Sequence, residues 1–140
     1  MTKALLATTL ASLAFAAPSF AEGNVVNGEK EFGKCKSCHM VVAPDGAEIV
    51  KGGKTGPNLY GVIGRPAASG DFKYGASLKA AGEKGLVWDV ASLAEYTVDP
   101  VAFLKKATGD DKAKSNMSFK LKKGGEDIAA WLASVAPATN

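Results

Sequence analysis

The chain has few residues that could hold a metal ion, with a single histidine and only two cysteines among its 140 residues. A structural zinc site uses four Cys or His ligands, and the three candidates here fall within one pentapeptide, which argues against zinc. The sequence also lacks internal repeats and low-complexity linkers, and beyond its N-terminal segment it has no apolar run long enough to cross a bilayer. These absences leave a chain of single-domain length with one candidate site.

That site is the run Cys-x-x-Cys-His formed by Cys35, Cys38 and His39. The pattern is typical of covalent attachment of c-type haem, because the two thiols can bond to two vinyl groups of the porphyrin and the next imidazole then lies under the iron. A thioredoxin-like dithiol would stand between a strand and a helix, whereas the flanks here are rich in Lys and Gly. A disulfide within the motif would close a small, strained loop. We therefore predict one haem c, with His39 as an iron ligand.

The N-terminus predicts export. Lys3 precedes a mostly apolar run over residues 4–17, and Ser19-Phe20-Ala21 places small residues at the two positions that a signal peptidase reads. We predict cleavage after Ala21, a single domain over residues 22–140, and a periplasmic location, where c-type haem is attached and thiols are exposed to oxidation. The alternative is an uncleaved segment that tethers the protein to the membrane.

A second iron ligand follows by elimination. A haem iron that transfers electrons rather than binding gas needs a sixth ligand, and no second histidine exists, so methionine is the next candidate. Met1 leaves with the signal peptide, and Met40 follows His39 directly and stays on its side of the iron. Met117 is far enough along the chain to approach from the other face. The alternative, that Met117 fills a gap in the core, is disfavoured by its polar, lysine-rich neighbours.

Apolar periodicity predicts a helical protein. A first helix is expected over about 25–34, and Asp89 can cap a second that ends at Asp99-Pro100. Pro100 can start a third helix that ends at Gly109, and an apolar stripe predicts a last helix from about Gly125. No strand pattern is evident, and residues 40–74 read as a loop rich in Gly and Pro.

Positive charge is concentrated in one segment. Residues 105–123 carry a local charge of +5, which exceeds the net charge of +3 for the whole chain. We predict a docking face for acidic partners, whose lysines are Lys105, Lys106, Lys112, Lys114, Lys120, Lys122 and Lys123 of this segment with Lys34, Lys36 and Lys54 beside the motif. A separate group, Lys73, Lys79 and Lys84, is expected to lie away from the loop that carries Met117. The alternative is a solvated lysine-rich loop without a partner.

Several motifs together resemble class I cytochrome c, most of all the soluble bacterial cytochrome c2 group. In chain order they are Cys35-x-x-Cys-His, Thr55-Gly-Pro-Asn-Leu, Gly64-Arg65, Gly85-Leu-Val-Trp, Leu93-x-Glu-Tyr, Pro100 and Met117-x-Phe. The resemblance implies an all-α fold in which N- and C-terminal helices pack together and shorter helices and loops wrap one covalent haem c. Two departures stand out. The segments 41–54 and 105–116 are longer than in the mitochondrial pattern, and Ser115-Asn116 stands where the mitochondrial branch usually has Thr-Lys.

The resemblance also implies roles for further residues. The carbonyl of Pro57 would accept a hydrogen bond from Nδ1 of His39. Tyr96 would lie near the sulfur of Met117, and Phe119 would close the exposed haem edge. Donors to the haem propionates would be Arg65, Tyr74 and Trp88.

The function implied is one-electron transfer through the haem edge, not enzymatic catalysis. The partners implied are a quinol-oxidising cytochrome bc complex as donor and a terminal oxidase or photosynthetic reaction centre as acceptor. The protein itself is expected to be a monomer and to bind no nucleic acid. Two alternatives remain open: a five-coordinate haem that acts as a peroxidase or gas sensor, which requires that Met117 does not bind iron, and a subunit of a larger oxidoreductase.

Overall fold

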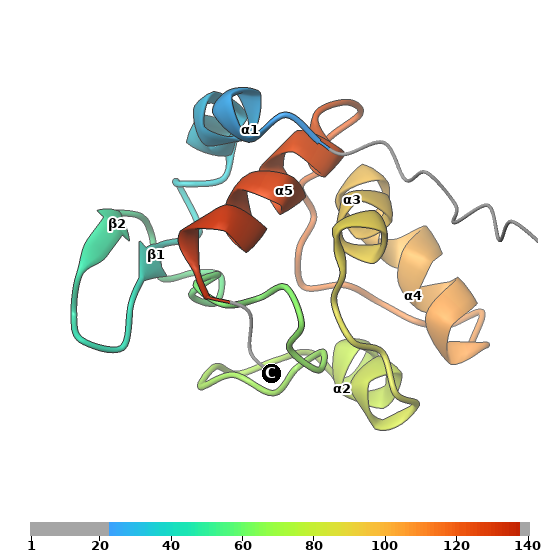
Figure 1. The fold of residues 1–140 in the computed structure, drawn as a ribbon. Coiled ribbons are helices and arrows are strands. Elements are labelled where there is room, and N and C mark those ends of the chain that lie inside the picture. Colours follow the sequence, from blue (N-terminus) through green and yellow to red (C-terminus); the bar gives the residue numbers. More distant parts are fainter. Residues whose placement is uncertain (1–22, 138–140) are drawn as a thin grey trace, which may run out of the picture.

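The computed structural model describes residues 23–137, so the predicted signal peptide lies outside the described part of the chain. The described residues form a mostly helical protein with one short hairpin (Figure 1). The helices are α1 (Val25–Glu31) with a following 3-10 turn η1 (Phe32–Lys34), α2 (Ala76–Glu83), α3 (Val90–Val98), α4 (Pro100–Thr108) and α5 (Gly125–Val135). No helix among these residues is long and apolar enough to cross a membrane.

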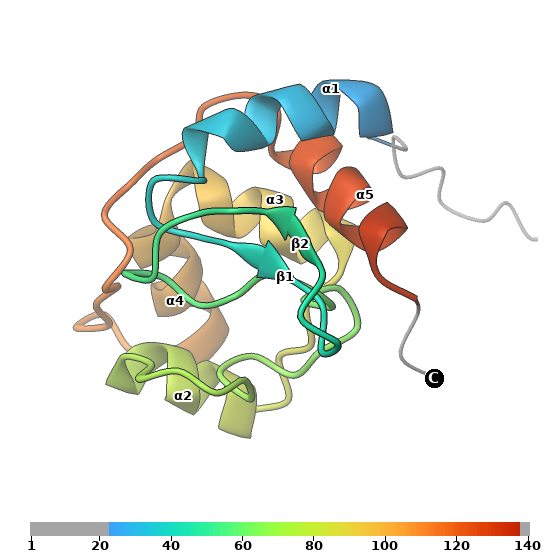
Figure 2. The ribbon, with the colours of Figure 1, turned by 90° about the vertical axis from the view of Figure 1, so that its left-hand side faces the viewer.

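The first and last helices cross at close range, as the resemblance implied (Figure 2). Gly28 makes this crossing possible, because a Cβ at that position would lie 2.0 Å from the carbonyl oxygen of Asp127 and 2.7 Å from Cβ of Trp131. Beside the crossing, the rings of Phe32 and Trp131 pack with centroids 4.9 Å apart. The α1–α5 pair therefore forms one wall of the molecule, and the Cys-x-x-Cys-His motif follows directly after η1.

The predicted helix boundaries at α3 and α4 are confirmed. Asp89 caps α3 by accepting the Ser92 N–H at 2.7 Å, and the Ser92 hydroxyl accepts the Asp89 N–H in return. Asp99 accepts the Ala102 N–H at the start of α4, Pro100 is its first residue, and Gly109 ends it in the left-handed conformation with φ 69°. Helix α3 packs on both α4 and α5.

Two elements were not predicted. Residues 41–50 form an antiparallel hairpin of β1 (Val41–Val42) and β2 (Glu48–Val50), whose tip holds Gly46 at φ 89° with no atom near its missing side chain. The strands are too short to show an alternating pattern. Helix α2 begins after Gly75, which offers no side chain as a cap, and so lacks the polar residue that marks the start of α3. It packs against α4.

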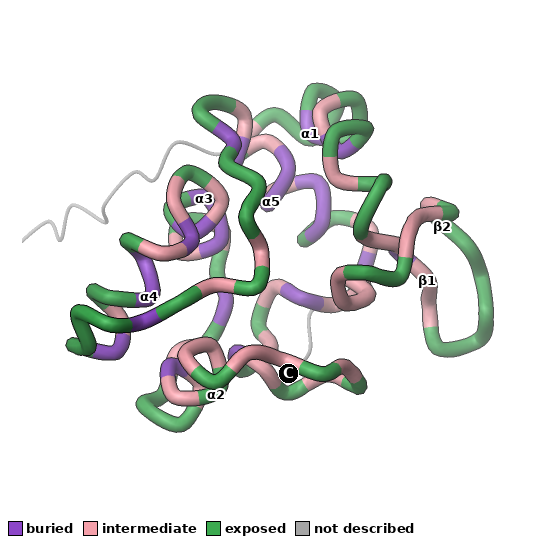
Figure 3. The backbone as a smooth tube through the Cα atoms, turned by 180° about the vertical axis from the view of Figure 1, so that it is seen from behind, coloured by how far each residue is buried: buried purple, intermediate pink, exposed green. Residues whose placement is uncertain are grey.

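The core is built by side chains from η1, α3, α4 and α5, with contributions from β1, α2 and the connecting loops (Figure 3). Its largest fully buried side chains are Phe32, Leu104, Leu132, Val41 and Pro100. The segment between α4 and α5, which carries Met117, runs across the same view as mostly exposed chain. The helices thus form a rigid frame, and the segment with the predicted second ligand spans it from outside.

Candidate cofactor site

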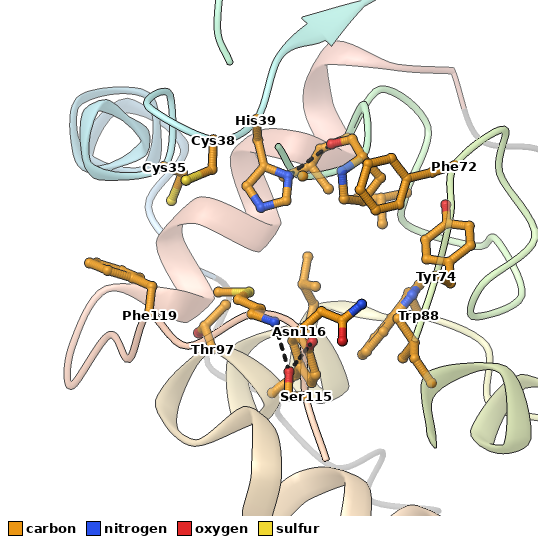
Figure 4. A pocket seen from close by; sticks show the side chains of 18 of the residues that line it. Cys35, Cys38, His39, Phe72, Tyr74, Trp88, Thr97, Ser115, Asn116 and Phe119 are labelled. Atoms are coloured by element: carbon orange, nitrogen blue, oxygen red, sulfur yellow. Dashed lines mark hydrogen bonds between the residues drawn. The ribbon is translucent and has the colours of Figure 1, made fainter. Parts of the chain in front are cut away.

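A cavity of about 400 Å³ lies within this frame, inside the range of about 300–1,000 Å³ found for cofactor sites. Figure 4 shows His39 on one side and Ser115, Asn116 and Phe119 on the other. Met117 belongs to the wall formed by this segment, whereas Met40 lines a neighbouring hollow instead. All the predicted haem residues line the cavity, namely Cys35, Cys38, His39, Pro57, Arg65, Tyr74, Trp88, Tyr96, Met117 and Phe119.

The two cysteines lie side by side at one edge of the cavity as free thiols (Figure 4). The motif turns sharply after the first helix, since the N–H groups of Cys38 and His39 both bond to the carbonyl of Cys35, at 3.1 and 2.9 Å. Burial raises the pKa of the Cys35 thiol to about 11. Hydrogen bonds from the hydroxyls of Thr55 and Ser37 lower the pKa of Cys38. The thiols are thus close in space but differ in acidity before attachment.

His39 is held in one tautomer. Its Nδ1 lies 2.8 Å from the carbonyl oxygen of Pro57, and because a carbonyl only accepts, Nδ1 must carry the proton. Burial lowers the pKa of His39 in spite of this bond, so the ring is neutral at pH 7. The other ring nitrogen points into the cavity (Figure 4) with its lone pair free for a metal. Gly56 lies under the ring, where a Cβ would approach it to 2.4 Å.

The loop that supplies Pro57 is tied to the motif along its length. The N–H groups of Gly53 and Gly56 donate to the carbonyls of Lys36 and Cys38 at 2.9 and 2.8 Å. Asn58 ties the same loop to β1, because its side chain accepts the Val42 N–H at 3.1 Å and donates to the Val42 carbonyl at 2.7 Å. This role of Asn58 was not predicted, and only its place in the Gly-Pro-Asn-Leu motif singled it out.

The opposite wall holds Met117 half-buried against the core. The Met117 N–H donates to the hydroxyl oxygen of Ser115 at 3.1 Å, and that oxygen lies 3.2 Å from the hydroxyl of Tyr96. Burial raises the pKa of Tyr96, so its hydroxyl stays protonated well above neutral pH. The Tyr96 ring packs edge-on against Trp88 and Phe103, at centroid distances of 5.2 and 5.6 Å. The loop with Met117 therefore rests on a buried aromatic cluster.

Arg65 and Tyr74 lie on a third side of the cavity. The Arg65 guanidinium donates to the carbonyls of Tyr60 and Asn58, both at 3.3 Å, which fixes its position. The Tyr74 ring packs edge-on against Phe72 at 5.4 Å (Figure 4). This side of the cavity therefore combines one positive charge with a phenol hydroxyl.

Apolar residues complete the lining. The sequence predicted the stripe on the last helix that contains Ile128 and Leu132, but not that it faces a cavity. Six further apolar residues line the cavity that were not predicted as cofactor contacts, namely Leu59, Val62, Phe72, Leu78, Leu93 and Leu104. With a thiol pair at one edge, a neutral imidazole on one face and a thioether in the facing wall, this lining fits a covalently attached haem.

The ten lysines of the predicted docking face are all exposed. Lys34 and Lys114 also line the cavity. Three of the ten are paired with carboxylates: Lys34 with Glu31, Lys106 with Glu95 at 2.8 Å, and Lys120 with Asp99 at 2.7 Å.

The expectation that Lys73, Lys79 and Lys84 lie away from the Met117 loop is wrong for Lys84, which caps the end of α2. The Ser77 hydroxyl of α2 accepts the Lys114 N–H at 3.0 Å, and the Lys84 ammonium donates to the carbonyl of Thr108, just before the loop starts. No pattern in the sequence indicated α2, so its contact with the loop could not be predicted.

Known proteins similar to this chain are bacterial c-type cytochromes. Cytochrome c-551 of Roseobacter denitrificans is 61% identical over 131 residues, which cover 94% of either chain. Cytochrome c2 of Rhodobacter capsulatus is 58% identical over 132 residues, covering 94% of this chain and 96% of that one. The crystal structure of ferric cytochrome c-550 from Paracoccus versutus has a TM-score of 0.80 at 55% identity, covering 83% of this chain and all of that one. No family model matches the sequence.

Proposed function

Because the chain belongs to the class I c-type cytochromes, in the group of bacterial cytochromes c2, c-550 and c-551, we propose that it is a soluble periplasmic one-electron carrier. Members of this family are electron-transfer proteins rather than enzymes, and they carry one covalently attached haem c. The observation that carries the proposal is the cavity lined by both the Cys-x-x-Cys-His motif and Met117.

The residues of the cavity would hold the haem in the following way. Cys35 and Cys38 would attach it, and His39 and Met117 would bind its iron from either face. When bound, the haem supplies a one-electron Fe(II)/Fe(III) couple. The Pro57 carbonyl keeps the His39 ring in the tautomer that offers a lone pair. The loop beside His39 is hydrogen-bonded to the motif, and the Met117 loop is joined to α3 through Ser115 and Tyr96, so little of the chain has to move when the charge changes.

The walls of the cavity would also set the potential. A thioether ligand favours the reduced state relative to a second histidine, and an apolar lining excludes water and disfavours extra charge. Trp88 and Tyr96 are buried, and Leu104 is fully buried.

Arg65, with Tyr74 and Trp88, would pair with the two propionates, whose negative charges need partners if they are inside the protein. Phe119 is 45% exposed and would cover the haem edge through which electrons pass.

The partners we propose are a cytochrome bc complex as donor and a terminal oxidase or photosynthetic reaction centre as acceptor, each met by transient electrostatic docking of a monomer. The exposed lysines of the docking face support this, because a cluster of one charge steers an oppositely charged partner. The N-terminal segment would direct export and be cleaved after Ala21, leaving residues 22–140 as one domain.

Substitution of Met117 tests the proposed ligation. The ferric holoprotein should show the weak long-wavelength absorption band of thioether ligation, and Met117→Ala should abolish it, lower the potential and let carbon monoxide bind the ferrous iron. Met40→Ala, which changes a methionine outside the cavity, should leave all three properties nearly unchanged. A wild-type protein that already binds carbon monoxide and lacks the band would instead indicate a five-coordinate haem and a peroxidase or sensor function.

The partners are tested with membranes of the source organism. Purified ferric protein should accept electrons from the quinol-oxidising complex, and ferrous protein should be oxidised by the terminal acceptor, both more slowly as salt rises. Absence of electron exchange with any membrane complex would contradict the proposed role.

A further inference from the structure

Helix α2 contacts the end of α4 and the segment that carries Met117 at two separated points. At the end of α2, the Lys84 ammonium donates to the carbonyl of Thr108, the last residue of α4. In its first turn, the Ser77 hydroxyl accepts the N–H of Lys114 at 3.0 Å, across 37 residues of sequence. The helix therefore runs alongside residues 108–114 and contacts both ends of this stretch.

A third contact lies close to the ligand itself. Gly75, the residue before α2, packs against the side chain of Asn116, which is the neighbour of Met117; a Cβ on Gly75 would lie 3.0 Å from the amide oxygen. Figure 4 shows Asn116 beside the cavity. The Asn116 side chain therefore packs directly against the backbone of Gly75, where any larger residue would crowd it.

Before Met117, the loop is otherwise held by the side chain of Ala113, which is buried in the core, and by a few local hydrogen bonds. The N–H groups of Asp110 and Lys112 bond to side chains within residues 108–110, and Ala113 bonds to the carbonyl of Asp110. The bond from Asp110 joins the start of the loop to the last residue of α4, whereas the bonds of Lys112 and Ala113 stay within the loop. Apart from the bonds of Gly109 and Asp110 to the end of α4, the described hydrogen bonds that join residues 109–117 to other elements are those to Ser77 and Tyr96.

We infer that α2 acts as a brace for the Met117 loop, and that the Ser77 hydroxyl is a positioning residue that resists displacement of Met117 from the iron. The inference rests on the proposed ligation by Met117. When another ligand replaces the thioether, the loop has to move away from the cavity, and this movement strains the bond between Ser77 and Lys114, three residues before Met117. A substitution that removes this bond therefore makes it easier for another ligand to displace Met117 from the iron.

Imidazole binding to the ferric holoprotein tests the inference, because its nitrogen competes with the Met117 sulfur for the iron. Ser77→Ala should raise the apparent affinity for imidazole about fivefold, which corresponds to about 1 kcal/mol, the net value of one hydrogen bond. Ser77→Thr keeps the hydroxyl and should restore affinity close to that of the wild type. The long-wavelength band should disappear in step with imidazole binding in each protein.

A matched control is Ser134→Ala. It also removes a hydroxyl with a hydrogen bond, to the carbonyl of Trp131 at 2.7 Å, but on α5. It should leave imidazole affinity unchanged, and unfolding followed by circular dichroism should differ little between the two alanine variants. If Ser77→Ala binds imidazole like the wild type, or if Ser134→Ala shifts binding equally, the brace is refuted. If the wild type has no long-wavelength band, ligation by Met117 fails instead.

Discussion

Gly28→Ala gives the sharpest test of the crossing between α1 and α5. The added Cβ would lie 2.0 Å from the Asp127 carbonyl oxygen, whereas real contacts begin near 3.0 Å, so the helices must separate by about 1 Å. Overpacking of this kind costs about 1–3 kcal/mol, and the loosened Phe32–Trp131 contact adds about 1 kcal/mol. The higher helix propensity of Ala returns about 1 kcal/mol. We expect a net loss of about 2 kcal/mol.

The measurement is guanidinium chloride unfolding of the ferric holoprotein, followed by far-ultraviolet circular dichroism. A loss of about 2 kcal/mol should also lower Tm by about 8 °C, at about 4 °C for each kcal/mol in a domain of this size. Gly33→Ala is the control, because its Cβ would meet no atom within 4 Å and should change stability by less than about 0.5 kcal/mol. Equal stability of the two variants would refute the close crossing.

Two further predictions concern the surface and one helix cap. Replacing Lys122 and Lys123 with Glu should slow reduction by an acidic partner at low salt. Replacing Lys30 and Lys51 with Glu changes the net charge by the same amount outside residues 105–123, and it should slow the reaction far less. Stopped-flow rates that fall by the same factor in both variants would show that only total charge matters. Asp89→Ala should cost about 1 kcal/mol at pH 7. Hydrogen bonds from Ser92 lower the pKa of Asp89. The Asp89 carboxylate therefore stabilises the fold fully above its ordinary pKa of about 3.9, and this stabilisation is lost as pH falls through the lowered pKa. In urea unfolding, the difference in stability between variant and wild type should be smaller at pH 2 than at pH 7.

The sequence predicted those parts of the fold that depend on local chemistry. Asp89 and Asp99 are side-chain caps and Gly109 is a left-handed terminator, so each marks a helix end without reference to the rest of the chain. The first and last helices were found from their apolar residues. The motif at Cys35 was found because its chemistry depends on spacing alone.

The parts that were missed depend on contacts between distant segments. Helix α2 starts at a glycine that offers no cap, and it is held by α4 and by the Met117 loop. The hairpin of β1 and β2 has strands too short for a pattern, and Asn58 holds it from another loop. The wrong placement of Lys84 followed from missing α2. Such contacts become visible only once the chain is folded.

The hairpin also offers a point for attaching the protein to a surface. Its tip projects from the body of the molecule (Figure 1), residues 44–49 are exposed, and a Cβ on Gly46 would meet nothing within 4 Å. By contrast, a Cβ on Gly52 or Gly53, a few residues later, would clash with the backbone of the haem-attachment motif. An affinity peptide inserted at residues 45–47 would therefore immobilise the protein on an electrode without disturbing the motif or covering the lysines of residues 105–123.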